Sequence, residues 1–241
     1  MNSFPRLLVA AVAVVVCLGF AACDALPGRP AVANREVVPS QVTAFDVLYE
    51  RNCAGCHGAG GRLGAARPLN DPVYLALVSA DRFRTIIGEG VPGTSMPAFR
   101  ASAGGDLTDA QVDALVKGML TRWTRAGAVA STTLPPYQGP GKGPGAGDRE
   151  RGAVVFASAC ARCHGPEGKG GPTMGSIVDP SYLALVSDQS LRTTVIAGRP
   201  DLGKPDWRDD LPGQPLTPQQ ISDLVAWLVG HRRPVPGRPE G

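Results

Sequence analysis

The chain has 241 residues, and its 31 glycines, 23 prolines and 5% aromatic residues predict short helices joined by long turns rather than one large apolar core. The formal net charge is +3, and it is +2 without Arg6. So small a positive charge excludes the electrostatic footprint of a protein that binds nucleic acid or acidic lipid, and we expect no nucleic-acid partner.

Residues 1–22 are typical of a signal peptide. A basic start, MNSFPR, precedes an apolar run of 14 residues, which is too short to cross a bilayer comfortably. The sequence FAAC ends at Cys23 and resembles the bacterial lipobox, in which the cysteine is lipidated, although Phe20 departs from the usual Leu. We expect a lipid anchor on Cys23, a tether over residues 23–40 and a location on the periplasmic side of the cytoplasmic membrane. The alternatives are a soluble periplasmic protein and an uncleaved N-terminal anchor.

The next feature along the chain is CAGCH at residues 53–57, which returns as CARCH at residues 160–164. In an exported protein, four such cysteines could form two disulfides or a zinc site. C-x-x-C-H is also the signature of covalent haem c attachment, and two copies in register with a wider repeat favour this interpretation. We expect two covalently bound haem c groups. The expected thioether residues are Cys53, Cys56, Cys160 and Cys163, and the expected proximal iron ligands are His57 and His164.

The wider repeat is direct. DPVYLALVS at residues 71–79 returns as DPSYLALVS at residues 179–187, and the offset between the copies grows from 107 at the haem motifs to 109 at Leu107 and Leu216. This pattern predicts one domain duplicated in tandem. The expected segments are a first domain at 41–126, a Pro/Gly-rich linker at 127–147, a second domain at 148–233 and a tail at 234–241.

Each copy has the pattern of an all-α domain of a few short helices. An amphipathic stretch precedes each motif, two short helices follow it, and a longer helix with capping-box spacing ends the copy. The expected caps are Thr108 with Gln111 and Thr217 with Gln220. The expected apolar faces are Val42, Phe45, Leu48 and Tyr49, then Val112, Leu115, Val116 and Met119, and in the second copy Gly152, Val155, Phe156 and Ala159, then Ile221, Leu224, Val225 and Leu228.

With these features, each copy resembles a class I cytochrome c domain, and the pair resembles membrane-attached di-haem cytochromes. The resemblance implies that the first helix crosses the last through a glycine and an aromatic residue four positions apart. Gly152 and Phe156 match, whereas Phe45 stands in place of the glycine in the first copy, so we expect a looser or shifted crossing there. GPTMG at residues 171–175 resembles the family's proximal stretch, which implies that Met174 packs on the proximal face of the haem.

The resemblance also implies a sixth iron ligand before the last helix of each copy. Met96, followed by proline, has this place in the first copy, and Lys204 has it in the second. A lysine must lose its proton to bind iron, which costs about 4.6 kcal/mol at pH 7. An open or water-bound iron, Met174 and His231 therefore stay as alternatives. Without a thioether ligand, the second haem would have the lower reduction potential. Electrons would therefore enter at the second haem, pass to the first haem, and leave from there.

The resemblance implies an electron carrier rather than an enzyme, working with or within a quinol-oxidising respiratory complex and delivering to a soluble cytochrome c or a terminal oxidase. The alternatives are a haem enzyme for peroxide or sulfur anions and a gas or redox sensor. Both would use a labile distal position at the second haem. The charged residues around Lys204 would serve such chemistry or form a solvated loop; they are Arg199, Asp201, Asp206 and Arg208.

Overall fold

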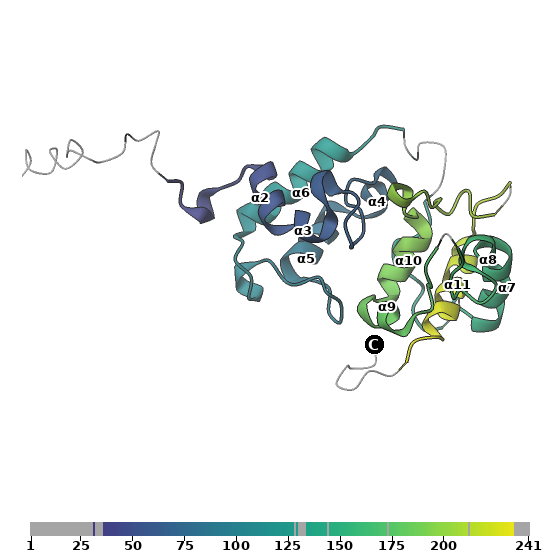
Figure 1. The fold of residues 1–241 in the computed structure, drawn as a ribbon. Helices are drawn as coiled ribbons and strands as arrows, with labels where there is room; N and C mark the ends of the chain where they lie inside the picture. Colours follow the sequence, from purple (N-terminus) through teal and green to yellow (C-terminus); the bar gives the residue numbers. More distant parts are fainter. Residues whose placement is uncertain are drawn as a thin grey trace, which may run out of the picture. The chain divides into compact units, whose positions relative to one another are not determined.

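The computed structural model describes residues 31, 36–127, 129, 134–143, 145–172, 174–211 and 213–233. Its described part is helical, with isolated β-bridges in place of strands (Figure 1). This confirms the all-α prediction. From Ser40 onward the described residues belong to one compact unit. Cys23, the expected signal peptide and the expected tail lie outside the described residues. Among the helices that are described, none has the length and apolar character needed to span a membrane.

The first repeat, which contains CAGCH, has its longest helix at the end. Its elements are η3 Pro39–Gln41, α2 Phe45–Asn52, α3 Ala54–His57, η4 Ala59–Gly61, α4 Pro72–Leu77, α5 Ala80–Glu89, η5 Ala101–Ala103 and α6 Asp109–Trp123. The second repeat, which contains CARCH, follows the same order of α-helices. Its elements are α7 Arg149–Ala159, α8 Ala161–His164, α9 Pro180–Leu185, α10 Asp188–Ala197, η6 Pro200–Leu202 and α11 Pro218–Val229.

Both final helices begin as their sequences predict. Thr108 and Gln111 form a complete capping box at α6, and Thr217 and Gln220 form another at α11. Most of the predicted apolar positions are buried as well, because they belong to the hydrophobic core. The exceptions are Val225, which is half-buried, and Val42, which is half-buried and lies before α2 rather than within it.

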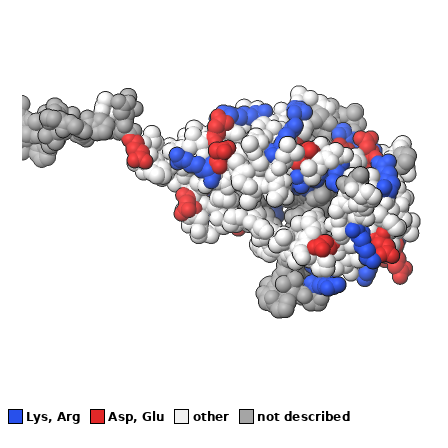
Figure 2. Space-filling model, in the orientation of Figure 1, with Lys and Arg blue, Asp and Glu red and all other residues white. Residues whose placement is uncertain are grey.

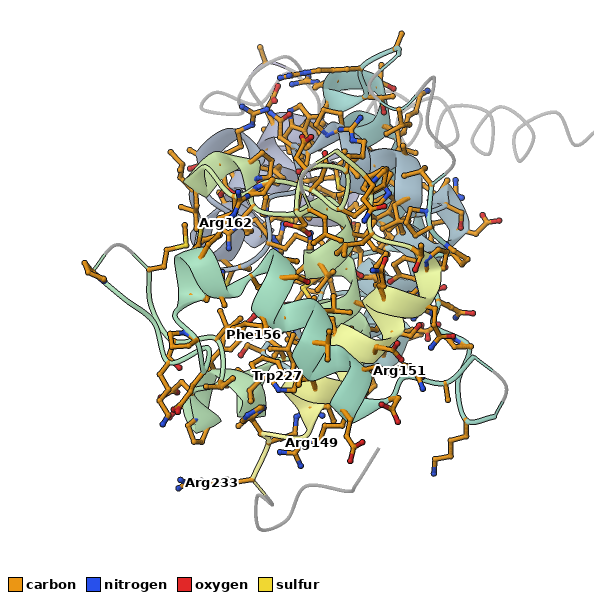
Figure 3. All side chains as sticks on the ribbon, turned by 90° about the vertical axis from the view of Figure 1, so that its right-hand side faces the viewer. Arg149, Arg151, Phe156, Arg162, Trp227 and Arg233 are labelled. Atoms are coloured by element: carbon orange, nitrogen blue, oxygen red, sulfur yellow. The ribbon has the colours of Figure 1, made fainter. Side chains whose placement is uncertain are left out.

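In the second repeat, α7 crosses α11 at a glycine. A Cβ on Gly152 would overlap the backbone carbonyl of Asp223 and come within 2.8 Å of Trp227 Cβ. One turn further along α7, Phe156 stacks on Trp227 with ring centroids 4.0 Å apart, and Figure 3 shows these two labelled rings between the helices. The resemblance predicted this crossing from Gly152 and Phe156, and the structure confirms it.

In the first repeat, α2 crosses α6 with the small and large residues exchanged. Phe45 on α2 packs against Gly118 on α6, where an added Cβ would overlap the Phe45 ring. Gly118 is the counterpart of Trp227 at the offset of 109 residues. Trp123, one turn later on α6, meets Phe45 and Tyr49 edge to face at 5.3 and 5.2 Å. The structure confirms the expectation of a looser or shifted crossing, because α2 and α6 approach each other over a shorter stretch than α7 and α11 and do so at a reversed pair.

The middle of the expected linker packs on the second repeat. Arg192 of α10 is 4% exposed and donates from Nε and Nη2 to the Pro136 carbonyl, at 3.1 and 2.9 Å. Its Nε also reaches the Tyr137 carbonyl, which accepts a 2.8 Å bond from Gln189. Residues 136 and 137 are thus held by the second repeat.

Candidate haem-binding site

Each C-x-x-C-H motif is a single helical turn attached to the helix before it. In the first repeat, the Cys53 amide donates to the Tyr49 carbonyl at 2.8 Å, and the His57 amide donates to the Cys53 carbonyl at 2.9 Å. In the second, the Cys160 amide donates to Phe156 and the His164 amide to Cys160, at 2.9 and 3.0 Å. The two motifs therefore share one local geometry, which fixes their cysteines and histidine relative to the aromatic crossing.

No disulfide joins any two of the four motif cysteines. Burial raises the pKa of Cys53 to about 12, with a smaller contribution from Cys56, and burial likewise raises the pKa of Cys160 to about 12. Across the described residues, no three His, Cys, Asp or Glu side chains gather into a group that could hold a metal ion. The observed geometry thus gives the disulfide and zinc interpretations no support, and paired thiols beside a histidine fit covalent haem.

His57 is oriented as a metal ligand needs to be. Its Nδ1 lies 2.7 Å from the Arg67 carbonyl, which can only accept, so Nδ1 carries the proton and Nε2 keeps a free lone pair. Burial lowers the pKa of His57, which favours the neutral ring. His164 has a buried Nδ1 with no hydrogen-bond partner among the described residues. Its pKa is lowered, first by burial and then by the charge of Lys204.

The backbone beside His164 does not support the proximal packing position that the resemblance gave to Met174. The counterpart of Arg67 in the second repeat is Gly175, whose backbone faces the His164 ring and acts to raise its pKa. Gly175 lies three residues after Pro172, so GPTMG does not align with the family's proximal stretch. Ile177 follows this carbonyl as Leu69 follows Arg67, and both pack against the core. The register therefore gives Ile177, not Met174, the proximal packing position.

The expected distal residues have equivalent places in their loops. Gly90 has φ +71°, and a Cβ there would lie 2.7 Å from the Met96 carbonyl. Gly198 has φ +66°, and a Cβ there would lie 2.9 Å from the Lys204 carbonyl. Only glycine suits both the left-handed backbone and the close approach. This geometry makes Lys204 the structural counterpart of Met96, as the repeat predicts.

Lys204 and Met174 lie together. Lys204 Nζ is 2.8 Å from Met174 Sδ, and both residues are half-buried. Because Lys204 also acts electrostatically on the His164 ring, the structure gathers both candidate ligands near one histidine. The third candidate ligand, His231, contacts Trp227 instead. Its Nδ1 lies 2.9 Å from the Trp227 carbonyl oxygen, and the centroids of the two rings are 4.5 Å apart.

The charged residues around Lys204 are paired with one another. Arg199 and Asp201 form an ion pair at 2.9 Å in which the Asp201 side chain is 2% exposed, and Arg208 pairs with Asp206 at 2.5 Å. The segment is therefore a solvated loop only in part, because the Asp201 carboxylate is paired and shielded. On the face shown in Figure 2, basic and acidic residues are interspersed rather than gathered into a patch of one sign.

Sequence reasoning missed Arg67, although a signal was available. The haem motifs repeat at an offset of 107 and the DP sequences at 108, so the sequence alone pairs Arg67 with Met174 or Gly175, and the contact of the Gly175 backbone with His164 selects Gly175. The first repeat thus has an arginine at a position where the second repeat has an uncharged residue, and this difference between the copies is visible in the sequence. It was missed because its contribution to His57 comes from a backbone carbonyl, which every residue type has.

Comparison with known proteins gives the following matches. Residues 40–117 match the family described as "Cytochrome C oxidase, cbb3-type, subunit III", and residues 149–231 match "Cytochrome c". The chain is 29% identical over 199 residues to the cbb3-type cytochrome c oxidase subunit FixP of Azorhizobium caulinodans, covering 81% of this chain and 61% of that protein. It is 33% identical over 138 residues to the CcoP subunit of Azospirillum sp., covering 53% of this chain and 40% of that protein.

These alignments span less than two thirds of the length of either relative. Among solved structures, a reducing HAO-like protein complex of Kuenenia stuttgartiensis matches with a TM-score of 0.45 and 16% identity, over 82% of this chain and 98% of that chain.

Proposed function

Because the chain belongs to the cytochrome c family, with two cytochrome c domains in tandem and a covalent haem c in each, we propose that it carries electrons within a respiratory oxidase complex. The observation that carries this proposal is the pair of equivalent C-x-x-C-H turns, each with its histidine beside a repeat-related backbone segment. The chain acts as an electron carrier rather than as an enzyme.

The haems, when bound, supply reversible one-electron chemistry. The protein's part is to attach and orient them. Cys53 and Cys56 provide the thioethers of the first site, and Cys160 and Cys163 those of the second. His57 is held by the Arg67 carbonyl with its Nε2 available, which limits its reorganisation when the charge at the site changes.

For the sixth ligands, we propose Met96 at the first haem and Lys204 at the second. Their equivalent positions opposite Gly90 and Gly198 support this assignment. Met174 is the alternative at the second haem, since its sulfur lies beside the Lys204 amine. While the Lys204 amine is protonated and not bound to iron, its charge lowers the pKa of His164, so the second site then differs electrostatically from the first.

The relatives' names support an oxidase as the partner. The finer proposals are a lipid anchor on Cys23, a place on the periplasmic side of the membrane, and exchange of electrons with a quinol-oxidising complex or a soluble cytochrome c. The domain bounds 41–126 and 148–233 are part of the same proposal. Metabolic labelling with a radioactive fatty acid tests the anchor: we expect label on the wild type and none on Cys23→Ser.

A reciprocal ligand exchange tests the haem assignments. In Lys204→Met, a thioether replaces the amine, so we expect the second haem's potential to rise and its ferric spectrum to change. In Met96→Lys, the matched control, the first haem's potential should fall. Potentiometry with optical and electron paramagnetic resonance spectra measures both. An unchanged second haem in Lys204→Met would sink the lysine assignment, and ready carbon monoxide binding by the reduced wild type would favour an open site.

The electron-carrier proposal has its own test. The reduced protein should be oxidised by a membrane preparation containing a cbb3-type oxidase, and this should require oxygen. Turnover of hydrogen peroxide or thiosulfate by the purified protein, abolished by Lys204→Ala and faster than with the isolated haem groups, would contradict it and favour the enzyme alternative.

A further inference from the structure

The two repeats meet through residues that flank their haem sites. The Arg67 guanidinium donates from Nη2 to Thr194 Oγ1 at 2.6 Å, and the Leu63 amide donates to Asp201 at 3.2 Å. Arg199 donates in the other direction, to the Gly64 carbonyl at 3.3 Å. On the first repeat, these contacts all lie in the segment between CAGCH and the proximal carbonyl, so the second repeat touches the loop that orients His57.

Arg67 connects this contact to the proximal histidine. Its carbonyl accepts the 2.7 Å bond from His57 Nδ1, while its guanidinium lies over the Tyr74 ring at 5.0 Å and bonds to Thr194. Its Nη1 is buried and has no hydrogen-bond partner in the part of the chain that is described. A buried guanidinium with so few partners depends strongly on each of them, because bonds to charged groups are worth more than neutral ones.

The contact is not a remnant of the duplication. The counterpart of Arg67 in the second repeat is Gly175, which has no side chain, and the counterpart of Thr194 in the first repeat is Ile86, which has no hydroxyl. Both partners therefore differ between the copies, and the bond exists only across them. In keeping with this, His164 lacks the close Nδ1 partner that His57 has.

We propose that Thr194 of the second repeat is a positioning residue for the haem of the first: it holds Arg67 and, through the Arg67 carbonyl, the proximal His57. The inference rests on the proposed function in taking His57 as an iron ligand. A strong Nδ1–H···O=C bond makes a histidine ligand more basic, which stabilises the oxidised iron. Loosening Arg67 weakens that bond, so the first haem should become easier to reduce.

The test uses the full di-haem protein with Thr194→Val, which removes the hydroxyl at nearly constant volume. We expect the first haem's potential to rise, the second haem's potential to stay in place, and the His57 ring N–H to exchange faster with solvent by NMR. Thr194→Ser should restore both values. The control is Thr85→Val: Thr85 bonds back to the Asp81 carbonyl as Thr194 bonds back to Ser190, but from a helix of the first repeat.

A double variant separates positioning from general loosening. If Thr194 acts through Arg67, Thr194→Val should add nothing in an Arg67→Met background. An unmoved first potential in Thr194→Val, an equal shift in Thr85→Val, or additive shifts in the double variant would overturn the inference. Covalent haem content separates the two levels: wild type without haem defeats the proposed function as well, whereas normal haem with an unmoved potential defeats only the positioning role.

Discussion

At each of the two helix crossings, a glycine on one helix makes room for an aromatic side chain on the other. The two crossings differ in which helix carries the glycine. In the second repeat the glycine is on the first helix and the aromatic residue on the last, as Gly152 and Trp227. In the first repeat the aromatic residue is on the first helix and the glycine on the last, as Phe45 and Gly118. What is shared between the copies is the sum of the two side chains, because close packing constrains the volume of a pair rather than the identity of either member.

The largest effect expected from this comparison is at Phe45 and Gly118. Phe45→Gly should destabilise the first repeat by about 4 kcal/mol, since it empties an aromatic site. Gly118→Trp should cost about 3 kcal/mol or more, since Phe45 already fills the space. The double variant recreates the Gly–Trp pair of the second repeat, so its cost should be at least about 2 kcal/mol below the sum. Hydrogen exchange of the α6 amides measures all three, and simple additivity would refute the exchange of volumes.

A smaller effect on stability is expected from substituting two arginines that have equivalent positions in the repeats. Arg192 is buried on linker carbonyls, whereas its counterpart Arg84 is exposed and pairs with Asp81 and Asp113. Arg192→Met removes a buried guanidinium together with its bonds to the Pro136 carbonyl, and should destabilise the second repeat by about 2 kcal/mol. Arg84→Met should have a much smaller effect, because exposed ion pairs are screened by solvent. Urea unfolding measures both, and faster proteolysis near Tyr137 should accompany only the first. Equal effects would show that the linker contact is not stabilising.

The smallest predicted difference concerns pH. Asp210 has a pKa raised to about 7, chiefly by burial and then by the charge of Asp206, while the corresponding stretch of the first repeat, Ala101–Ala103, has no carboxyl group. The folded state then binds more protons than the unfolded state between pH 4 and 7, so the second repeat should lose stability as pH rises through this window.

Asp210→Asn removes that titration, and the pH slope measured by exchange of the α11 amides should flatten. The slope in α6 provides the control, because it depends on Asp71, whose pKa burial also raises. A slope in α11 that is the same with and without the Asp210 carboxyl would disprove the prediction.

What the sequence could predict was local. The haem motifs, the two capping boxes and the apolar faces follow from spacings within one or two turns, and the duplication makes Lys204 the counterpart of Met96. The Phe45–Gly118 contact was not predicted because the two residues are distant in sequence, and neither residue by itself indicates a helix crossing. The proximal register was misassigned because it depends on a backbone carbonyl, and the approach of Met174 to Lys204 depends on how two separate loops fold back.

The reversed crossings also bear on how a duplicated chain assembles correctly. Two similar repeats on one polypeptide risk pairing the first helix of one with the last helix of the other. Here α7 against α6 would set Gly152 opposite Gly118 and leave a void, and α2 against α11 would force Phe45 onto Trp227. Each first helix is therefore complementary in shape to the last helix of its own repeat. The reversed placement of the bulky residue disfavours pairing between helices of different repeats during folding.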